Sequence, residues 1–247
     1  MKVVCISFCT GNHSIGNIVN ENQPIHPMPF FTKFVELQLA MLQHNARLTN
    51  THPYQSDPIS WPFLLRGISF WSDKDKNAAR QIYLLGNIWG WWLAGTSVLG
   101  YVALMLADTI CRKRGFEPIE PAVRKRLIRS GGIFAIGYAL HYFPFFLMNR
   151  QLFLHHYLPS AIFAYLLVGV MFEFCFVDGI LWPTSMDHPR NLPKITILGV
   201  LMWFAIVAVQ VGFFVWMRHM IYGLSGMTVA DWQARQLLQG WDLAFLK

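Results

Sequence analysis

Residues 131–177 read GGIFAIGYALHYFPFFLM, then NRQLFLHH, then YLPSAIFAYLLVGVMFEFCFV: two long apolar runs joined by a short polar link. A helix needs about 20 mostly apolar residues to cross a bilayer, and each run is close to that length. A helix also satisfies its backbone hydrogen bonds internally, which lipid requires. The stretch therefore predicts a hairpin of two membrane-spanning helices, whose link carries an arginine and two adjacent histidines.

Two more stretches, residues 88–107 and 195–217, are long enough to span a bilayer and contain no charged residue. The whole chain of 247 residues is 54% hydrophobic and only 13% charged, whereas a soluble domain carries about 25% charged residues. The fold class that we predict is therefore an all-α membrane protein. It has four transmembrane helices, with an interfacial helix and loops on the lumenal side.

Orientation follows from a cluster of seven cations in the link 108–130, which are Arg112, Lys113, Arg114, Arg124, Lys125, Arg126 and Arg129. Because cation-rich loops stay in the cytosol, we expect the link 149–156 and both chain termini on the opposite, non-cytosolic side. No aromatic stacking platform for bases is interleaved with these cations. The net charge of +7 therefore predicts topology, and we predict no nucleic-acid partner.

The chain divides into four predicted parts: an irregular segment 1–28, a lumenal interfacial segment 29–87, the four-helix domain 88–221 and a lumenal interfacial tail 222–247. The start, MKVVCISFCTGNHSIGN, lacks the apolar core and cleavage site of a signal peptide. A long polar head that must be translocated without a signal leads us to expect a C-terminal fragment of a larger membrane protein.

Helical spacing of apolar residues over 29–48 predicts an amphipathic helix, which lies on the membrane face or packs on another domain. Three prolines exclude a regular helix in 51–71. The aromatic side chains of this stretch fit the headgroup level: Trp61, Phe63, Phe70 and Trp71. We expect a solvated turn at 72–80, and membrane-boundary positions for Trp232 and Trp241 in the tail.

Arg150, His155, His156 and Tyr157 lie together in sequence at the lumenal end of the predicted hairpin. The planar guanidinium suits a phosphate, and imidazole and phenol groups add hydrogen bonds. We predict that these four residues face an anionic phosphate group at the membrane surface. The alternative is that their polar tips reach the water from an apolar surface and bind nothing.

His141 is an ionisable group inside a span, which makes it a functional candidate; the alternative is a neutral imidazole bonded to a neighbouring helix. Glu173 is expected to reach water or pair with a local cation such as Arg190. Adjacent histidines diverge by about 100° on a helix, whereas metal-binding pairs use i, i+4 spacing, and the four cysteines lack zinc spacing. We predict no metal, no cofactor and no identifiable catalytic residue; Asp57 is the best-placed carboxylate but is typical of a turn.

Three stretches are long and unusual: MLQHNARLTNTHPYQSDPISWPFLLRGISFW (41–71), QIYLLGNIWGWW (81–92) and HYFPFFLMNRQLFLHHYLP (141–159). They closely resemble the C-terminal membrane region of the protein O-mannosyltransferases, the dolichyl-phosphate-mannose–protein mannosyltransferases, and are nearest to the homodimer-forming branch. The resemblance implies a glycosyltransferase of the endoplasmic reticulum membrane. Its donor is dolichyl phosphate mannose, and its acceptors are Ser and Thr residues of secretory or membrane proteins.

The resemblance also implies parts that this sequence does not carry: many N-terminal spans, an Asp-Glu pair in the first lumenal loop, and a lumenal MIR domain. We therefore expect a chain that is inactive alone and that contributes residues 150–157 to the donor site. The alternatives are a non-catalytic membrane scaffold or dimerisation module, and a haem or small-solute membrane protein. No two histidines are level across two predicted spans, which argues against haem.

Overall fold

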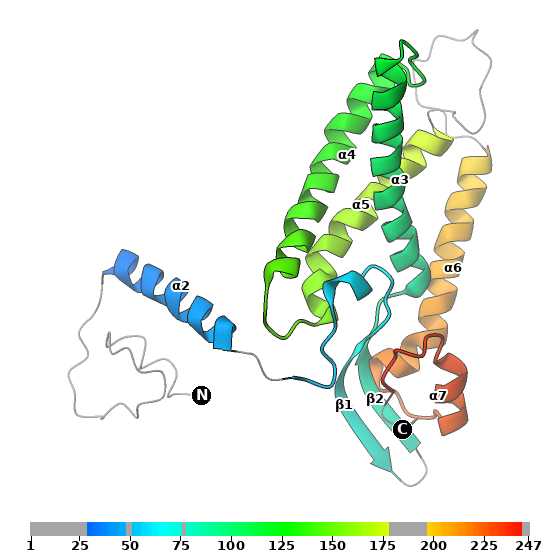
Figure 1. Cartoon of the computed structure of the whole chain (residues 1–247). Coiled ribbons are helices and arrows are strands. Elements are labelled where there is room, and N and C mark those ends of the chain that lie inside the picture. Colours follow the sequence, from blue (N-terminus) through cyan, green and yellow to red (C-terminus); the bar gives the residue numbers. More distant parts are fainter. Residues whose placement is uncertain (1–28, 48–50, 76–77, 178–196, 244–247) are drawn as a thin grey trace. The chain divides into compact units, whose positions relative to one another are not determined.

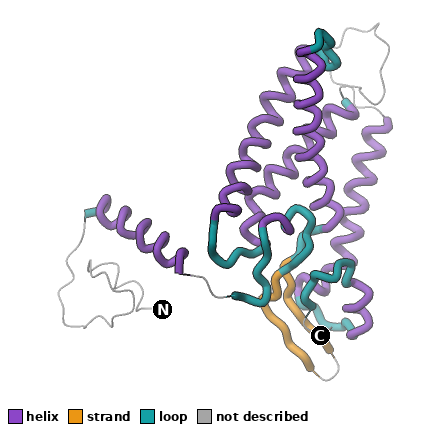
Figure 2. Tube along the Cα trace, viewed as in Figure 1, coloured by secondary structure: helices purple, strands orange, loops and turns teal. Residues whose placement is uncertain are grey.

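The computed structural model describes residues 29–47, 51–75, 78–177 and 197–243. The chain forms two compact units, one of residues 1–51 with 149–151 and one of residues 52–148 with 152–247. Figure 2 shows that the described residues are mostly helical, with a single pair of strands. The irregular segment predicted at 1–28 lies outside the described residues.

The smaller unit contains α2 (Phe30–Arg47), a helix at the position predicted from apolar spacing. Its first turn is closed by the Lys33 amide, which donates to the Pro29 carbonyl over 3.1 Å. Phe30 and Phe34 stack one turn apart, with ring centroids separated by 6.4 Å. Both rings are exposed, which is consistent with a helix that lies on a membrane face. That placement stays a prediction.

The larger unit contains four long helices: α3 (Ile88–Lys113), α4 (Pro121–Tyr142), α5 (Leu158–Phe176) and α6 (Ile197–Tyr222). All four are long and apolar enough to cross a membrane, which confirms the predicted all-α fold. Figure 1 shows α3, α4 and α5 in one bundle, with α6 beside α3. At most 28% of the residues in the apolar stretch of each helix are buried, so all four helices have apolar side chains at the surface of the protein.

The link predicted at 108–130 is shorter than expected, because both flanking helices extend into it. α3 continues to Lys113, and α4 begins at Pro121, whose fixed φ suits a first helical turn. Arg124, predicted as a loop cation, is buried instead. Its Nε donates to Asp108 Oδ2 over 2.8 Å. A charge can be buried here because it is paired and hydrogen-bonded.

Proline residues set the ends of the helices at the predicted lumenal side. A proline inside a helix removes a hydrogen bond and clashes with the preceding turn, and α4 ends at Tyr142, before Pro144. The chain then forms the 3-10 helix η2 (Phe143–Leu147). A second 3-10 helix, η3 (Leu154–Tyr157), leads into α5, where Pro159 occupies the first turn.

Two antiparallel strands, β1 (Ile68–Asp75) and β2 (Ala78–Leu84), precede α3. The solvated turn predicted at 72–80 is therefore wrong, because the strands run through most of it. Successive side chains of β2 alternate between buried and exposed, as the side chains of a strand do: Gln81 and Tyr83 are buried, and Ile82 between them is exposed. Burial raises the pKa of the Tyr83 hydroxyl. The hydroxyl oxygen accepts a hydrogen bond from the Gly67 amide over 3.1 Å.

The tail contains α7 (Val229–Arg235), which begins with a capping box. Asp231 accepts hydrogen bonds from the Thr228 amide and hydroxyl, both over 2.8 Å, and these bonds lower the pKa of its carboxyl group. Trp232 and Trp241 are 0% and 1% exposed, so other parts of the protein cover both rings. Their predicted membrane-boundary positions stay a prediction.

Helix α4 packs against α3 through a glycine. A Cβ atom added at Gly131 would lie 2.8 Å from Cζ and 3.0 Å from Cδ2 of the Tyr101 ring, and it would be closer still to Cε2. The ring cannot move away freely, because the Tyr101 hydroxyl donates to the Leu127 carbonyl over 3.1 Å. At the next position, Gly132, the nearest atom is the Tyr101 hydroxyl oxygen at 3.7 Å, which is ordinary contact.

We predict that Gly131→Ala lowers the midpoint of thermal unfolding of the purified protein in detergent, while Gly132→Ala leaves it unchanged or raises it. Both substitutions gain the same helix propensity, about 1 kcal/mol. Only the first overpacks the α3–α4 contact, at a cost of about 1–3 kcal/mol. Equal midpoints for the two variants would contradict this packing.

Candidate functional site

The end of the larger unit at which α4 ends and α5 begins is covered by residues 52–67, which we call the rim loop. It contains the 3-10 helix η1 (Pro58–Ser60) but no α-helix or strand. The loop joins the link between α4 and α5, since the Ser56 amide donates to the Leu152 carbonyl over 2.9 Å. Trp61, predicted at the headgroup level, is fully buried. Its indole N–H donates to Ser56 Oγ over 2.9 Å.

Aromatic side chains satisfy the carbonyl groups of the rim loop. Tyr142 Oη donates to Pro58 O over 3.0 Å, and the Trp91 indole donates to Trp61 O over 2.6 Å. The two remaining donors act in the same way: Trp92 to Phe63 O and Trp241 to Leu64 O, each over 3.0 Å. Four aromatic donors from α3, α4 and the tail thus fix a backbone that has little regular hydrogen bonding of its own.

Tyr157 lies in the core beneath the rim loop and is 2% exposed. Its hydroxyl is 3.2 Å from that of Tyr138 on α4. Its ring contacts the rings of Trp91 and Tyr142, with centroids 5.4 Å and 5.5 Å away. In this arrangement Tyr157 holds α5 against α3 and α4, so its first role is positional.

The two histidines of η3 differ in their surroundings. The His156 ring is stacked on Trp61, with centroids 6.3 Å apart, and its Nδ1 lies 3.0 Å from Phe153 O. His155 is exposed, and its ring stacks on His156 at 4.3 Å. The structure thus brings His155, His156 and Tyr157 to one end of the bundle, with His155 outermost. Within the described residues, no three His, Cys, Asp or Glu side chains converge to hold a metal ion.

Arg150, the fourth predicted residue, belongs to the smaller unit. There its Nη1 donates to Asn45 Oδ1 over 2.9 Å, which ties the link 149–151 to α2. The guanidinium group is partly buried. The sequence does not predict this contact, because Asn45 precedes Arg150 by 105 positions.

His141, the intramembrane candidate, is bonded within its own helix. Its Nδ1 lies 2.8 Å from Gly137 O, one turn earlier on α4, and its ring packs on Phe163 of α5, with centroids 5.1 Å apart. The hydrogen-bond partner of the imidazole is therefore a backbone carbonyl of α4 itself, and not a group on a neighbouring helix as the alternative predicted. Glu173 pairs with Arg126 of α4, at 3.4 Å between Oε1 and Nε. Arg190, the expected partner, lies outside the described residues.

A polar pocket of about 420 Å³ opens beside the rim loop. It is lined by Gln55, Ser56, Asp57, Ser60, Leu65, Arg66, Gly240 and Asp242. Arg66 joins two other lining residues: its Nε donates to Asp242 Oδ2 and its Nη1 donates to Gln55 O, both over 2.8 Å. Asp57 is a turn residue as predicted, since its carbonyl accepts from the Ser60 amide over 2.9 Å. Its carboxylate makes no cap hydrogen bond and lines the pocket.

Sequence reasoning finds Asp57 and misses the rest of this pocket. Arg66 and Asp242 are separated by 176 positions, so no local motif links them. The available signal is weak: a lone arginine after a Pro-rich aromatic loop, and a lone aspartate beside Trp241 in an otherwise apolar tail.

Comparisons with a family model and with individual known proteins point to the same protein family. The family model for the "C-terminal four TMM region of protein-O-mannosyltransferase" matches residues 30–241. The chain is 36% identical over 220 residues to dolichyl-phosphate-mannose–protein mannosyltransferase 4 of Saccharomyces cerevisiae, covering 86% of this chain and 28% of that protein. The Candida albicans protein of the same name is 37% identical over 214 residues, which covers 87% of this chain and 28% of that protein.

A solved structure shares the fold. It is the S. cerevisiae protein O-mannosyltransferase Pmt1-Pmt2 complex bound to the sugar donor, with a TM-score of 0.71 and 33% sequence identity. The match covers 92% of this chain and 29% of the solved chain. The chain thus spans less than a third of the length of these relatives.

We predict that Arg66→Ala loosens the tail, because it removes the bonds that join residue 242 to the rim loop. Amide hydrogen exchange over residues 236–243 should become faster, while α3 keeps its protection. Arg80→Ala is the matched control: Arg80 is equally exposed, at 35%, and pairs with Asp73 inside the hairpin. A tail that exchanges equally in both variants would show that Arg66 does not hold it.

Proposed function

Because the chain belongs to the protein O-mannosyltransferase family, we propose that it is the C-terminal membrane part of an enzyme that mannosylates proteins. The enzyme transfers mannose from dolichyl phosphate mannose to Ser or Thr hydroxyl groups of secretory or membrane proteins. The observation that carries the proposal is the match of the four-helix region over residues 30–241. The names of the curated relatives state the same donor and reaction class.

We further propose that the link between α4 and α5 faces the phosphate of the donor. A polyprenyl phosphate keeps its tail in lipid and its charged phosphate at the membrane surface. The exposed imidazole of His155 is suited to bond that phosphate. Arg150 lies five positions earlier in the sequence, and on that sequence proximity alone we propose it as the cation for the same phosphate. His156 and Tyr157 support the site by fixing η3 through Trp61 and Tyr138.

The topology proposal places the α3–α4 turn in the cytosol and the rim loop in the lumen of the endoplasmic reticulum. What supports it is the concentration of cations at the α3–α4 turn, since such loops are retained in the cytosol. A homodimer is proposed from the family branch that the sequence resembles. Among the relatives, the solved complex pairs Pmt1 with Pmt2.

With this topology, a glycosylation reporter fused after Lys247 should be modified when the protein is inserted into microsomes. The α3–α4 turn should at the same time be cut by protease added from the cytosolic side. An unmodified reporter together with a protected turn would reverse the proposed orientation.

The function is tested in a chimera in which residues 30–241 replace the matching region of the S. cerevisiae relative. We expect mannosyl transfer, and we expect Arg150→Ala to weaken the dependence on donor by about ten- to a hundredfold, because a hydrogen bond to a charged group contributes roughly 1.5–3 kcal/mol. Arg150→Lys should restore part of this, since an ammonium lacks the planar fork. The measurement is a donor titration at fixed acceptor peptide.

Two controls separate this role from a structural one. Asn45→Ala removes the bond from Arg150 to α2 but keeps the cation, and Arg129→Ala removes a cation at the proposed cytosolic side. Neither should change the donor dependence. A folded, inserted chimera without transfer would contradict the enzymatic function. An unchanged donor response in Arg150→Ala would favour the scaffold alternative for this part of the chain.

A further inference from the structure

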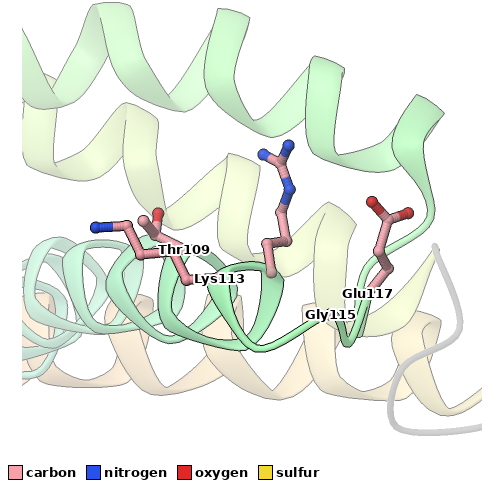
Figure 3. A pocket seen from close by; sticks show the side chains of 5 residues that line it. Thr109, Lys113, Gly115 and Glu117 are labelled. Carbon is pink, nitrogen blue, oxygen red and sulfur yellow. The ribbon is translucent and has the colours of Figure 1, made fainter.

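A second pocket lies at the α3–α4 turn, at the opposite end of the bundle from the rim loop (Figure 1). It has a volume of about 610 Å³ and is lined by Thr109, Arg112, Lys113, Gly115 and Glu117. Figure 3 shows Thr109 and Lys113 at one end of this pocket and Glu117 at the other, beside Gly115. Nothing in the proposed mannosyl transfer uses these residues, so the pocket needs its own explanation.

The turn that carries the pocket has a fixed shape. Arg124 is buried beneath it, with Nε bonded to Asp108 Oδ2 over 2.8 Å and Nη2 to Ile119 O over 2.9 Å. Gly115 adopts a φ of +80°, which favours glycine, and its amide donates to Arg112 O over 3.0 Å. Both carboxylate oxygens of Asp108 accept hydrogen bonds from Arg124. The Asp108 charge is therefore neutralised by Arg124 and does not neutralise the cations at the surface.

Five surface cations in the turn and in the adjoining ends of α3 and α4 have no ion pair within the described residues: Arg112, Lys113, Arg114, Lys125 and Arg129. Two of them, Arg112 and Lys113, line the pocket. A pocket with a guanidinium and an ammonium group on its wall suits a phosphate, which accepts several charge-assisted hydrogen bonds.

An apolar flank leads to this cationic wall. Leu106 and Ile110 lie on the α3 face that carries Lys113, because they precede it by seven and three positions. Their side chains are 59% and 53% exposed. Phe116, beyond the end of the helix, is 63% exposed. Acyl chains fit such a flank and a free phosphate does not need it, so the arrangement favours a lipid.

The pocket also offers an acceptor. The Glu117 carboxylate is 57% exposed and 3.9 Å from Arg124 Nη1, whose guanidinium is already bonded to Asp108. Glu117 would repel a simple phosphate, but it suits a headgroup that carries an amine next to its phosphate. A serine headgroup has a phosphate, an ammonium and a carboxylate, and its net charge complements one carboxylate among several cations.

We propose that the α3–α4 pocket binds the headgroup of an anionic, amine-bearing glycerophospholipid of the phosphatidylserine type. Arg112 and Lys113 bond its phosphate, Glu117 bonds its ammonium group, and the acyl chains lie along Leu106 and Ile110. The site does not depend on mannosyl transfer, and it stands if the donor site at the rim loop proves to be elsewhere.

The test uses the whole chain in phosphatidylcholine nanodiscs that contain increasing fractions of phosphatidylserine or phosphatidylglycerol, with retained lipid measured by native mass spectrometry. Each cation near an anionic headgroup contributes about fivefold in affinity. The double variant Arg112→Ala/Lys113→Ala should therefore retain phosphatidylserine roughly 25-fold more weakly. The matched control, Lys125→Ala/Arg129→Ala, removes the same charge outside the pocket and should retain the lipid almost as wild type does.

Glu117→Gln should abolish the preference for phosphatidylserine over phosphatidylglycerol while retaining both lipids. Equal losses in the two double variants would overturn the site in favour of general electrostatic attraction. Displacement of the lipid by millimolar inorganic phosphate would overturn the lipid as occupant, and an unchanged preference in Glu117→Gln would overturn the amine. Thermal unfolding of each variant in detergent checks that it is folded. The double variant Arg112→Lys/Lys113→Arg keeps both charges and should retain phosphatidylserine.

Discussion

A bilayer offers no water to bond a free N–H or C=O group, and this constraint governs where each kind of backbone occurs in the protein. The four spans are helical, and irregular backbone is confined to the ends of the bundle. Two polar side chains inside the spans obey the same rule. Ser97 bonds Leu93 O over 2.8 Å, and His141 lies 2.8 Å from Gly137 O. These groups are satisfied by their own helix and need no partner across the bundle.

The rim loop has the opposite problem, because its prolines limit it to short turns with few backbone hydrogen bonds of its own. Indole N–H and phenol O–H groups supply the missing donors, and their rings fill the space beneath the loop. The same residues thus pack and bond, which is the combination that tyrosine and tryptophan provide. Tyr142 illustrates it: its ring contacts Tyr157 at 5.5 Å while its hydroxyl bonds Pro58 O. The surface of the candidate donor site rests on this layer.

The spans are predictable from sequence because lipid imposes one local rule on about 20 consecutive residues. Pairing between distant residues follows no such rule. The hairpin escapes prediction because residues 72–80 are mostly polar and charged, a composition typical of a loop. Arg66 and Asp242 are brought together only by the fold. The burial of Arg124 is also not predictable from the sequence. A cation next to a span is typical of a loop, and the pairing of Arg124 with Asp108 becomes evident only in the structure. Of the candidate site, the location of His155, His156 and Tyr157 at one bundle end is predictable, and the separate roles of the three are not.

The contact between Trp241 and the Leu64 carbonyl has a consequence for the order of assembly. These residues are 177 positions apart, so the loop is synthesised long before the residue that closes it. At roughly 5–20 residues per second, the interval is about 9–35 s. During that time α3 to α6 must enter the membrane, and only then can the tail fold back over the loop. The rim-loop end of the bundle is therefore the last part of the membrane domain to fold, and a ribosome that stops before Trp241 leaves four helices whose rim loop lacks this hydrogen bond.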